Sequence, residues 1–400
     1  MSAALEPRRE RRMVWVLAGI QFVNILDFVL MMPLGPQLMR LFDLTPREFG
    51  LLVSAYMFAA AAAGIAASAF IDRFDRKKVL LALFGGFAAA LLGTAAAPGY
   101  PALLAAHALG GVFGGVLGMQ VHAYIGDTIP EGRRGAATGL VMSAFAVSSV
   151  AGIPIGLVLA DLAGWRAPFA LLAAGAAALA LLAARVLPPL AGHLHGRRAE
   201  HFLATLARVI ADPNHRRAFL LIAALMLAAF SIVPQLAPYY VRNVRVAESD
   251  LALLWFVSGL VTFFTTRWIG RQVDLHGKQR MFRAVALAST VPILITTHLP
   301  PVPLAVAVLA SVLFMSISSG RFVPAMALVN AAAAPGARGS FLSLSGAVQQ
   351  ASAGLASLLS GLVIGQNAAG ELTRYGWMGW FAVAMTLAAV WLARRVRSVS

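Results

Sequence analysis

Asp27 is a carboxylate in the middle of a long apolar stretch, and its chemistry would be proton binding. A charged Asp at the centre of a bilayer costs about 2.5–3.5 kcal/mol on insertion scales. We therefore expect its side chain to face a central cavity, to be paired, or to carry a proton. A reversible proton site is the functional hypothesis, and a structural hydrogen bond to a neighbouring helix is the alternative.

His107 is an ionisable residue in another apolar stretch, at a similar expected depth. With a rise of about 1.5 Å per residue, both residues lie about 21 Å above the inner ends of their helices. Imidazole exchanges protons in the physiological pH range. The two residues therefore predict an Asp27–His107 proton pair, and the alternative for His107 is a hydrogen bond within helix packing.

Several other side chains inside apolar stretches are candidates for the wall of a substrate cavity. Arg321 could bind an anionic group or neutralise Asp27, and the alternative is that it snorkels to the inner interface. The amides could line the cavity or bridge helices, and Met and Phe could form its apolar wall or simply pack. The predicted cavity residues are Asn24, Phe28, Met31, Gln120, Gln235, Arg321, Gln349 and Gln350.

Helices in lipid must position these residues, because the composition fits no soluble class. The 400 residues are 60% hydrophobic and 12% charged, with a mean hydropathy of +0.80, whereas soluble domains are about 45–50% apolar and 25% charged. Twelve segments have the length that a bilayer core of about 30 Å requires, and they do not alternate as strands would. We therefore predict an all-α membrane protein with twelve transmembrane helices. The segments are roughly 13–38, 48–71, 78–97, 101–126, 135–160, 166–187, 217–240, 250–271, 281–299, 303–329, 340–365 and 376–394.

The net charge of +16 predicts an orientation and does not indicate nucleic-acid binding. The basic residues form short clusters between the apolar segments, as the positive-inside rule describes. With the N-terminus inside, 25 Lys and Arg residues fall on the cytoplasmic side and 6 on the outer side. Both termini are therefore predicted to be cytoplasmic. The chain has no Cys, which excludes disulfides and thiolate chemistry.

A linker and a repeat divide the chain into two bundles. Residues 189–216 contain Phe202, Leu206, Val209 and Ile210 at helical spacing, which predicts a short amphipathic helix on the inner surface that ends before Asp212-Pro213. We expect an N-terminal six-helix bundle at 1–188, this linker at 189–216, and a C-terminal six-helix bundle at 217–400.

Charged motifs recur at equivalent places in the two halves. Asp72 and Asp274 are 202 residues apart, as are Arg76 and Lys278, and Arg134 and Arg338 are 204 residues apart. The spacing predicts duplication of a six-helix unit, and chance matches of short motifs are the alternative. Pseudo-symmetric bundles of this kind hold a binding site between them in transporters.

The first motif copy, from Ser68 to Lys77, resembles the loop motif Gly-x-Leu-Ala-Asp-Arg-x-Gly-Arg-Lys of the major facilitator superfamily. Ser68 and Asp75 stand in place of two glycines. The second copy keeps Gly270, Asp274, Gly277 and Lys278. The resemblance covers essentially the whole chain, and it implies a transporter that works by alternating access.

The resemblance implies that charged residues at the inner loops form a cytoplasmic gate, which latches helix ends in one state. The residue chemistry agrees, because Asp72 can face a helix N-terminus and Arg76 and Lys77 can pair with Asp127. The alternative is plain anchoring of the loops by charge. The predicted gate residues are Asp72, Arg73, Arg76, Lys77, Asp127, Arg134, Asp274, Lys278 and Arg338.

The fifth segment carries Gly152, Pro154 and Gly156, which are similar to the Gly-Pro motif of twelve-span drug/proton antiporters. Ile153 stands in place of one glycine of that motif. These residues are expected to bend or loosen the helix, to allow close packing, or both.

His107 occupies a place where the family has an arginine associated with proton transfer. The resemblance implies proton-coupled export.

These observations predict a secondary active transporter that exports a small organic or drug-like compound in exchange for protons. No phosphate-binding loop, Ser-His-Asp set or convergent metal pattern is visible, so we expect no enzyme activity, no cofactor and no metal. The alternatives are proton-linked or facilitated uptake of a small organic anion or metabolite, and a membrane sensor on a transporter scaffold. We expect the substrate, protons and the lipid bilayer as partners, no nucleic acid, a monomer, and the bacterial inner membrane as the location.

Overall fold

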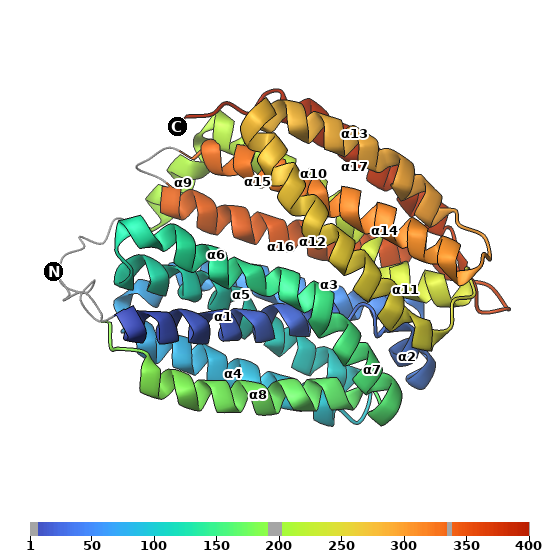
Figure 1. Ribbon diagram of the computed structural model, residues 1–400, viewed down its shortest axis with the longest axis horizontal. Coiled ribbons are helices and arrows are strands. Elements are labelled where there is room, and N and C mark those ends of the chain that lie inside the picture. The colour runs from blue at the N-terminus through green and yellow to red at the C-terminus, as the bar shows by residue number, and fades with distance from the viewer. Residues whose placement is uncertain (1–6, 191–201, 334–337, 400) are drawn as a thin grey trace. The chain divides into compact units, whose positions relative to one another are not determined.

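The computed structural model describes residues 7–190, 202–333 and 338–399, and helices dominate it (Figure 1). Within these ranges, 11 helical stretches are long and apolar enough to cross a membrane. The twelfth predicted helix is α16 (Arg338–Val363), whose 26 residues correspond to about 39 Å. It contains several Ser residues and two adjacent Gln residues. The all-α fold class and its twelve predicted helices are confirmed.

The described residues form two compact units. Unit 1 comprises the described parts of Met1–Leu30 and Ala55–Ala199, and unit 2 those of Met31–Ser54 and Glu200–Ser400. The division therefore falls inside α3 (Pro46–Ser68), whose first residues belong to unit 2. The other helices of unit 1 are α1 (Pro7–Leu30), η1 (Ile71–Arg73), α4 (Arg76–Ala96), α5 (Tyr100–Thr128), α6 (Glu131–Val147), η2 (Ser148–Gly152), α7 (Ile153–Ala163) and α8 (Arg166–Val186).

Unit 2 holds the remaining helices and a two-stranded antiparallel pair in which Gly365 lies opposite Thr373. In unit 2, α10 packs on α16 and α17, and α12 packs on α14 (Figure 1). Its elements are α2 (Gly35–Leu41), α9 (Phe202–Ala211), α10 (Pro213–Phe230), α11 (Val233–Arg242), η4 (Glu248–Asp250), α12 (Leu251–His276), α13 (Lys278–Thr297), α14 (Leu304–Gly320), α15 (Phe322–Ala331), α16, β1 (Gly365–Gln366), β2 (Leu372–Thr373) and α17 (Tyr375–Ala393).

Four predicted segments contain an interruption, and a proline follows each of them within the first three residues of the next helix. A proline occupies one of the first two positions of α2, α7 and α11, where a missing N–H costs no helical hydrogen bond. The fourth interruption is at Arg321, between α14 and α15, and Pro324 is the third residue of α15. These breaks place irregular backbone inside the segments, which is typical of functional sites in membrane proteins.

The fifth segment is both loosened and closely packed, as its sequence predicts. A π-helical turn, η2, lies directly before α7, whose second residue is Pro154. A Cβ atom on Gly152 would lie 2.8 Å from Leu26, and one on Gly156 would lie 2.7 Å from Leu30. These two glycines therefore allow the fifth segment to lie directly against α1.

The predicted linker helix is present as α9, and residues 191–201 lie outside the described residues. Asp212 does more than stop this helix, because its side chain caps α10 by accepting hydrogen bonds from the N–H groups of Asn214 and His215. Partial burial works to raise the pKa of Asp212, but the two backbone donors and nearby cationic side chains outweigh it and hold this pKa below its ordinary value.

Candidate functional site

The centre of unit 1 is a buried polar cluster formed by α1, α3 and α5. It contains Asn24, Asp27, Tyr56 and His107, all of them less than 10% exposed. The ring of Tyr56 lies 4.9 Å from that of His107, measured between centroids. The Tyr56 hydroxyl donates to Oδ1 of Asn24 at 3.4 Å, and the Asn24 amide donates to the carbonyl of Gly114 at 3.2 Å.

Asp27 is 2% exposed and lies beside α5, where its Oδ2 is 3.6 Å from the position of a Cβ on Gly110. Gly110 is one turn after His107, so the structure places Asp27 and His107 in one neighbourhood. The described residues offer no hydrogen-bond partner to Oδ1 of Asp27 or to either ring nitrogen of His107. The two predicted proton residues are therefore not hydrogen-bonded to each other, and the ring of Tyr56 lies beside that of His107.

Glycines of α5 allow Tyr56 to reach this position. A Cβ on Gly111 would lie 2.9 Å from the carbonyl carbon of Tyr56, and one on Gly114 would lie 2.6 Å from Oδ1 of Asn24. Real side chains do not tolerate such separations, so α3 and α5 touch backbone to backbone here. This close approach is the role that the glycine-rich sequence of the fourth segment predicts.

The predicted cavity residues fall in both units. In unit 1, Phe28 lies 5.2 Å from Tyr56 between ring centroids, and Gln120 is buried with its Oε1 lacking a partner among the described residues. In unit 2, Met31 is buried and Gln235 donates to the carbonyl of Pro46 at 2.9 Å. Gln349 and Gln350 are half-buried on α16.

Arg321 lies in unit 2 at the junction of α14 and α15. Its guanidinium donates to Oγ of Ser289 at 3.1 Å and to Oγ1 of Thr386 at 2.8 Å. The residue is only 1% exposed, so the snorkelling alternative is wrong. Among the described residues no carboxylate forms an ion pair with it, and hydroxyl groups of α13 and α17 solvate the charge instead.

In unit 1, residues of the loop after α3 form a network of hydrogen bonds and an ion pair. Nε of Arg76 donates to Oδ2 of Asp127 at 2.9 Å, which is the pairing that the sequence predicts. Asp75 caps α4 by accepting from the N–H of Lys78, and its other oxygen accepts from the N–H of Leu190 at 2.9 Å. The network therefore joins the start of α4 to the end of α5 and to the segment that follows α8.

The other predicted gate residues of unit 1 contribute less to this network. Arg134 donates to the carbonyl of Ile129 at 2.8 Å and so closes the turn before α6. Arg73 is exposed and Lys77 is half-buried. Asp72 is in η1, and its side chain lies outside the described residues.

The equivalent loop in unit 2 is built differently. Asp274 and Lys278 are exposed, and within the described part of the chain neither forms an ion pair. Gly277 separates α12 from α13 with a φ of +84°, a conformation that favours glycine. The side chain of Arg338 lies outside the described residues.

Two features of unit 1 are not predicted by the sequence reasoning above. Tyr56 contacts Asn24 and His107 of the buried cluster, and also Phe28. The only sequence signal for this is an aromatic hydroxyl in an apolar run. Arg133 pairs with Glu10 at 2.9 Å between the start of α6 and the first turn of α1. Nothing in their spacing of more than 100 residues indicates this contact.

Comparison with known proteins gives matches along the chain. The profile described as Major Facilitator Superfamily matches residues 17–271, and that of the PUCC protein matches residues 183–398. The uncharacterized MFS-type transporter YceJ of Bacillus subtilis is 27% identical over 88% of each chain. A probable sugar efflux transporter of Helicobacter pylori (strain G27) is 24% identical over 62% of this chain and 61% of its own length.

Solved structures share the fold at low sequence identity. A D-xylose-proton symporter superposes with a TM-score of 0.79 at 16% identity, covering 97% of this chain and 98% of the symporter. A bacterial homologue of the lysosomal transporter Spinster gives a TM-score of 0.74 at 16% identity, with 98% of each chain covered. With a family profile that matches more than half of its residues, this chain belongs to the major facilitator superfamily, and it is a multi-pass membrane transporter rather than an enzyme.

Proposed function

We propose that this transporter exports a small organic compound and exchanges it for protons, with Asp27 as the residue that carries the proton. The observation that supports this is the buried Asp27 carboxyl, which has no cationic partner among the described residues. A carboxyl group in a transmembrane segment is costly as an unpaired ion and is therefore suited to bind and release a proton.

The surroundings of Asp27 support a role in coupling. Tyr56, Asn24 and His107 supply a hydroxyl, an amide and an imidazole near it, along the stretch of α5 from His107 to Gly114. A polar cluster in the middle of an apolar bundle can bind substrate polar groups when the cavity opens. The name of the Helicobacter relative favours export, and sugars are the first substrate class to examine.

The experiment is a proteoliposome assay with a pH-sensitive dye inside the vesicles. A panel of mono- and disaccharides and the cationic dye ethidium are offered one at a time under an imposed proton gradient. We expect one class to be moved with a matching proton flux in the wild type. Asp27→Asn is expected to abolish the gradient-driven movement and to retain downhill exchange.

A matched control is Asp161→Asn, because Asp161 is an exposed carboxylate at the end of α7. It is expected to transport like the wild type. Gradient-driven transport that persists in Asp27→Asn would reject the assignment, and substrate movement without any proton flux in the wild type would reject antiport.

The alternative of anion uptake through Arg321 receives less support. The guanidinium is buried between α13 and α17, where Ser289 and Thr386 accept its hydrogen bonds. Both bonds come from Nη1, whereas Nε has no hydrogen-bond partner among the described residues. The name of the Helicobacter relative favours export over anion uptake, so the buried cluster around Asp27 is the better starting point for experiments.

A further inference from the structure

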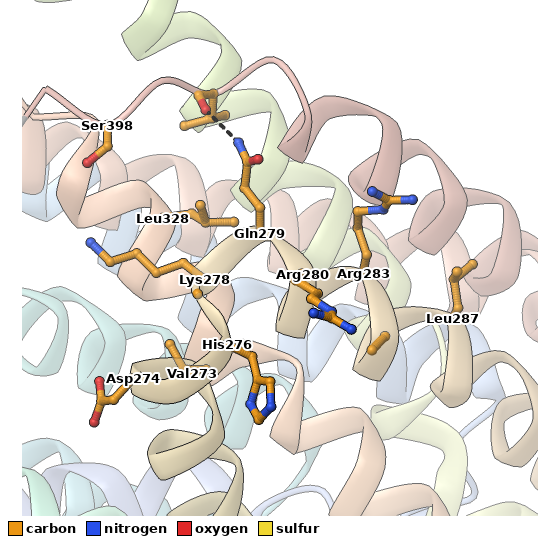
Figure 2. A pocket seen from close by; sticks show the side chains of 13 residues that line it. Val273, Asp274, His276, Lys278, Gln279, Arg280, Arg283, Leu287, Leu328 and Ser398 are labelled. Atoms are coloured by element: carbon orange, nitrogen blue, oxygen red, sulfur yellow. Dashed lines mark hydrogen bonds between the residues drawn. The ribbon is translucent and has the colours of Figure 1, made fainter.

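A recess of about 1060 Å³ opens in unit 2 where α12 ends and α13 begins (Figure 2). Its wall contains Asp274, Lys278, Arg280, Arg283 and Leu287, and the last four lie on the first three turns of α13. The C-terminal segment closes one side, where Gln279 donates to the carbonyl of Val396 at 3.2 Å. The charge distribution of the sequence predicts that this end of the unit is cytoplasmic.

The recess carries an excess of positive charge. Lys278, Arg280 and Arg283 oppose the single carboxylate of Asp274, and none of these four forms an ion pair with any described residue. The first turn of α13 has no acidic residue and no side-chain cap. The free N–H groups of that turn therefore add to the positive potential of the three basic side chains.

The duplicated loop of unit 1 shows how a closed version of this site is built. There Asp75 caps α4, and Arg76 is paired with Asp127 from α5. At the 202-residue offset of the repeat, Gly277 and Lys278 occupy the places of Asp75 and Arg76. The helix that would supply the second carboxylate, α15, contains no acidic residue. Unit 1 thus uses its own carboxylates to pair Arg76 and to cap α4, and unit 2 has neither carboxylate at the equivalent positions.

An apolar stripe continues from the recess along the same face of α13. Leu287, Val291 and Ile295 follow Arg283 at intervals of four residues and are 45%, 61% and 43% exposed. Residues at this spacing share one side of a helix. The recess is therefore connected to an apolar strip that a hydrocarbon chain could cover. A phospholipid has such a chain, whereas a free phosphate ion does not.

We propose that this recess binds the phosphate headgroup of an anionic phospholipid, with an acyl chain along the stripe of Leu287, Val291 and Ile295. Arg280 and Arg283 bind the phosphate oxygens, Lys278 and the N-terminus of α13 add attraction, and Asp274 sets the side from which the headgroup enters. Basic pockets at the ends of transmembrane helices are suited to such headgroups, and each basic residue near the membrane surface adds attraction to anionic lipid.

The test is lipid titration of the purified full-length chain, followed by native mass spectrometry. The probes are dioleoyl phosphatidylglycerol, dioleoyl phosphatidylcholine with the same acyl chains, and water-soluble glycerol 3-phosphate. Arg280→Gln combined with Arg283→Gln is expected to weaken phosphatidylglycerol binding at one site by about 10- to 30-fold. One bound lipid fewer is then expected at the lipid concentration that fills this site in the wild type. Leu287→Gln is expected to weaken phosphatidylglycerol affinity at the same site about 3-fold, because it removes one apolar contact.

The matched control combines Arg185→Gln with Arg216→Gln, two exposed arginines that do not line this recess. It removes the same charge and is expected to bind like the wild type. A smaller recess of about 660 Å³ with Arg8, Arg11 and Arg12 in its wall stays intact in every variant, so the readout is the loss of one site rather than of all lipid.

Three results would overturn the proposal. They are equal phosphatidylglycerol affinity in the double variant and the wild type, equal binding of phosphatidylcholine and phosphatidylglycerol, and displacement of the lipid by glycerol 3-phosphate at comparable concentration. The last result would make the recess a site for soluble phosphate. All three substituted residues are exposed, so thermal unfolding of the variants is expected to match the wild type. If the double variant does not fold, Lys278→Gln carries the same test.

Discussion

Gly111 of α5 lies directly against the backbone of Tyr56 of α3, with room for no side chain between them. A Cβ atom on Gly111 would lie 2.9 Å from the carbonyl carbon of Tyr56. The neighbouring atom is backbone, which cannot rotate away, so any larger residue must displace a helix. The position of Tyr56, and with it the cluster around Asp27, depends on this contact.

Gly111→Ala is therefore expected to destabilise the protein by about 1–3 kcal/mol and to reduce transport, because it overpacks this contact. Gly126→Ala on the same helix is the control, since nothing lies within 4 Å of a Cβ there. Alanine favours a helix over glycine by about 1 kcal/mol, so the control is expected to unfold at an equal or higher temperature. Thermal unfolding in detergent measures both, and equal effects of the two substitutions would contradict the packing argument.

The ion pair of Arg76 and Asp127 is expected to couple the start of α4 to the end of α5. The Arg76 side chain is 7% exposed and that of Asp127 is 37% exposed, so the pair is only partly screened by solvent. In a double-mutant cycle with Arg76→Gln and Asp127→Asn, we expect a coupling energy of about 1 kcal/mol. Additive changes in unfolding free energy would show that the pair does not join the two helices.

Arg321 is expected to depend on its hydroxyl partners and not on a carboxylate. Thr386→Val removes a hydrogen bond to a charged group and is expected to cost about 1.5–3 kcal/mol. Thr290→Val is the control, because the Thr290 hydroxyl donates only to the carbonyl of Leu287. Arg321→Met, which removes the buried charge and keeps much of the volume, is expected to be neutral or stabilising. Thermal unfolding distinguishes these cases, and a strongly destabilised Arg321→Met would indicate an additional anionic partner.

The cap of α10 predicts a pH-dependent contribution to stability. The pKa of Asp212 in the folded protein is below its ordinary value of 3.8, so its contribution is present above that value and is lost as the pH falls through the folded pKa. Asp212→Ala is expected to cost about 0.5–2 kcal/mol at neutral pH. The difference from the wild type is expected to shrink below the ordinary pKa.

Asp250→Ala is the control for this prediction, because Asp250 precedes α12 without a side-chain capping bond. It is expected to change the unfolding temperature less at neutral pH. A cost of Asp212→Ala that stays constant from neutral to acidic pH would contradict the capping argument.

Much of the fold can be predicted from the sequence, because lipid forces long apolar segments to form helices. The helix breaks near Pro36, Pro154 and Pro234 follow from a residue that lacks an N–H group. The pair of Arg76 and Asp127 is also predictable, since both residues lie at the inner ends of adjacent segments. These features depend on local chemistry and on topology.

The contacts of the candidate site are harder to predict. Tyr56 in an apolar helix is indistinguishable from a packing residue until α5 is placed beside it. The partners of Arg321 are common hydroxyl residues 32 and 65 positions away, and no motif marks them. Asp75 occupies a place where the family has a glycine, so its capping role is a property of this chain.

The π-helical turn at Ser148–Gly152 makes the fifth segment shorter than a continuous α-helix of the same residues would be. A π turn holds one residue more than an α turn, so conversion to α geometry would advance everything beyond it by about 1.5 Å and rotate it by about 100°. Gly152 and Gly156 present no side chains that would oppose such a screw motion against Leu26 and Leu30. The part of the fifth segment beyond η2 would then turn a different face toward the interior and move along its axis by about 1.5 Å.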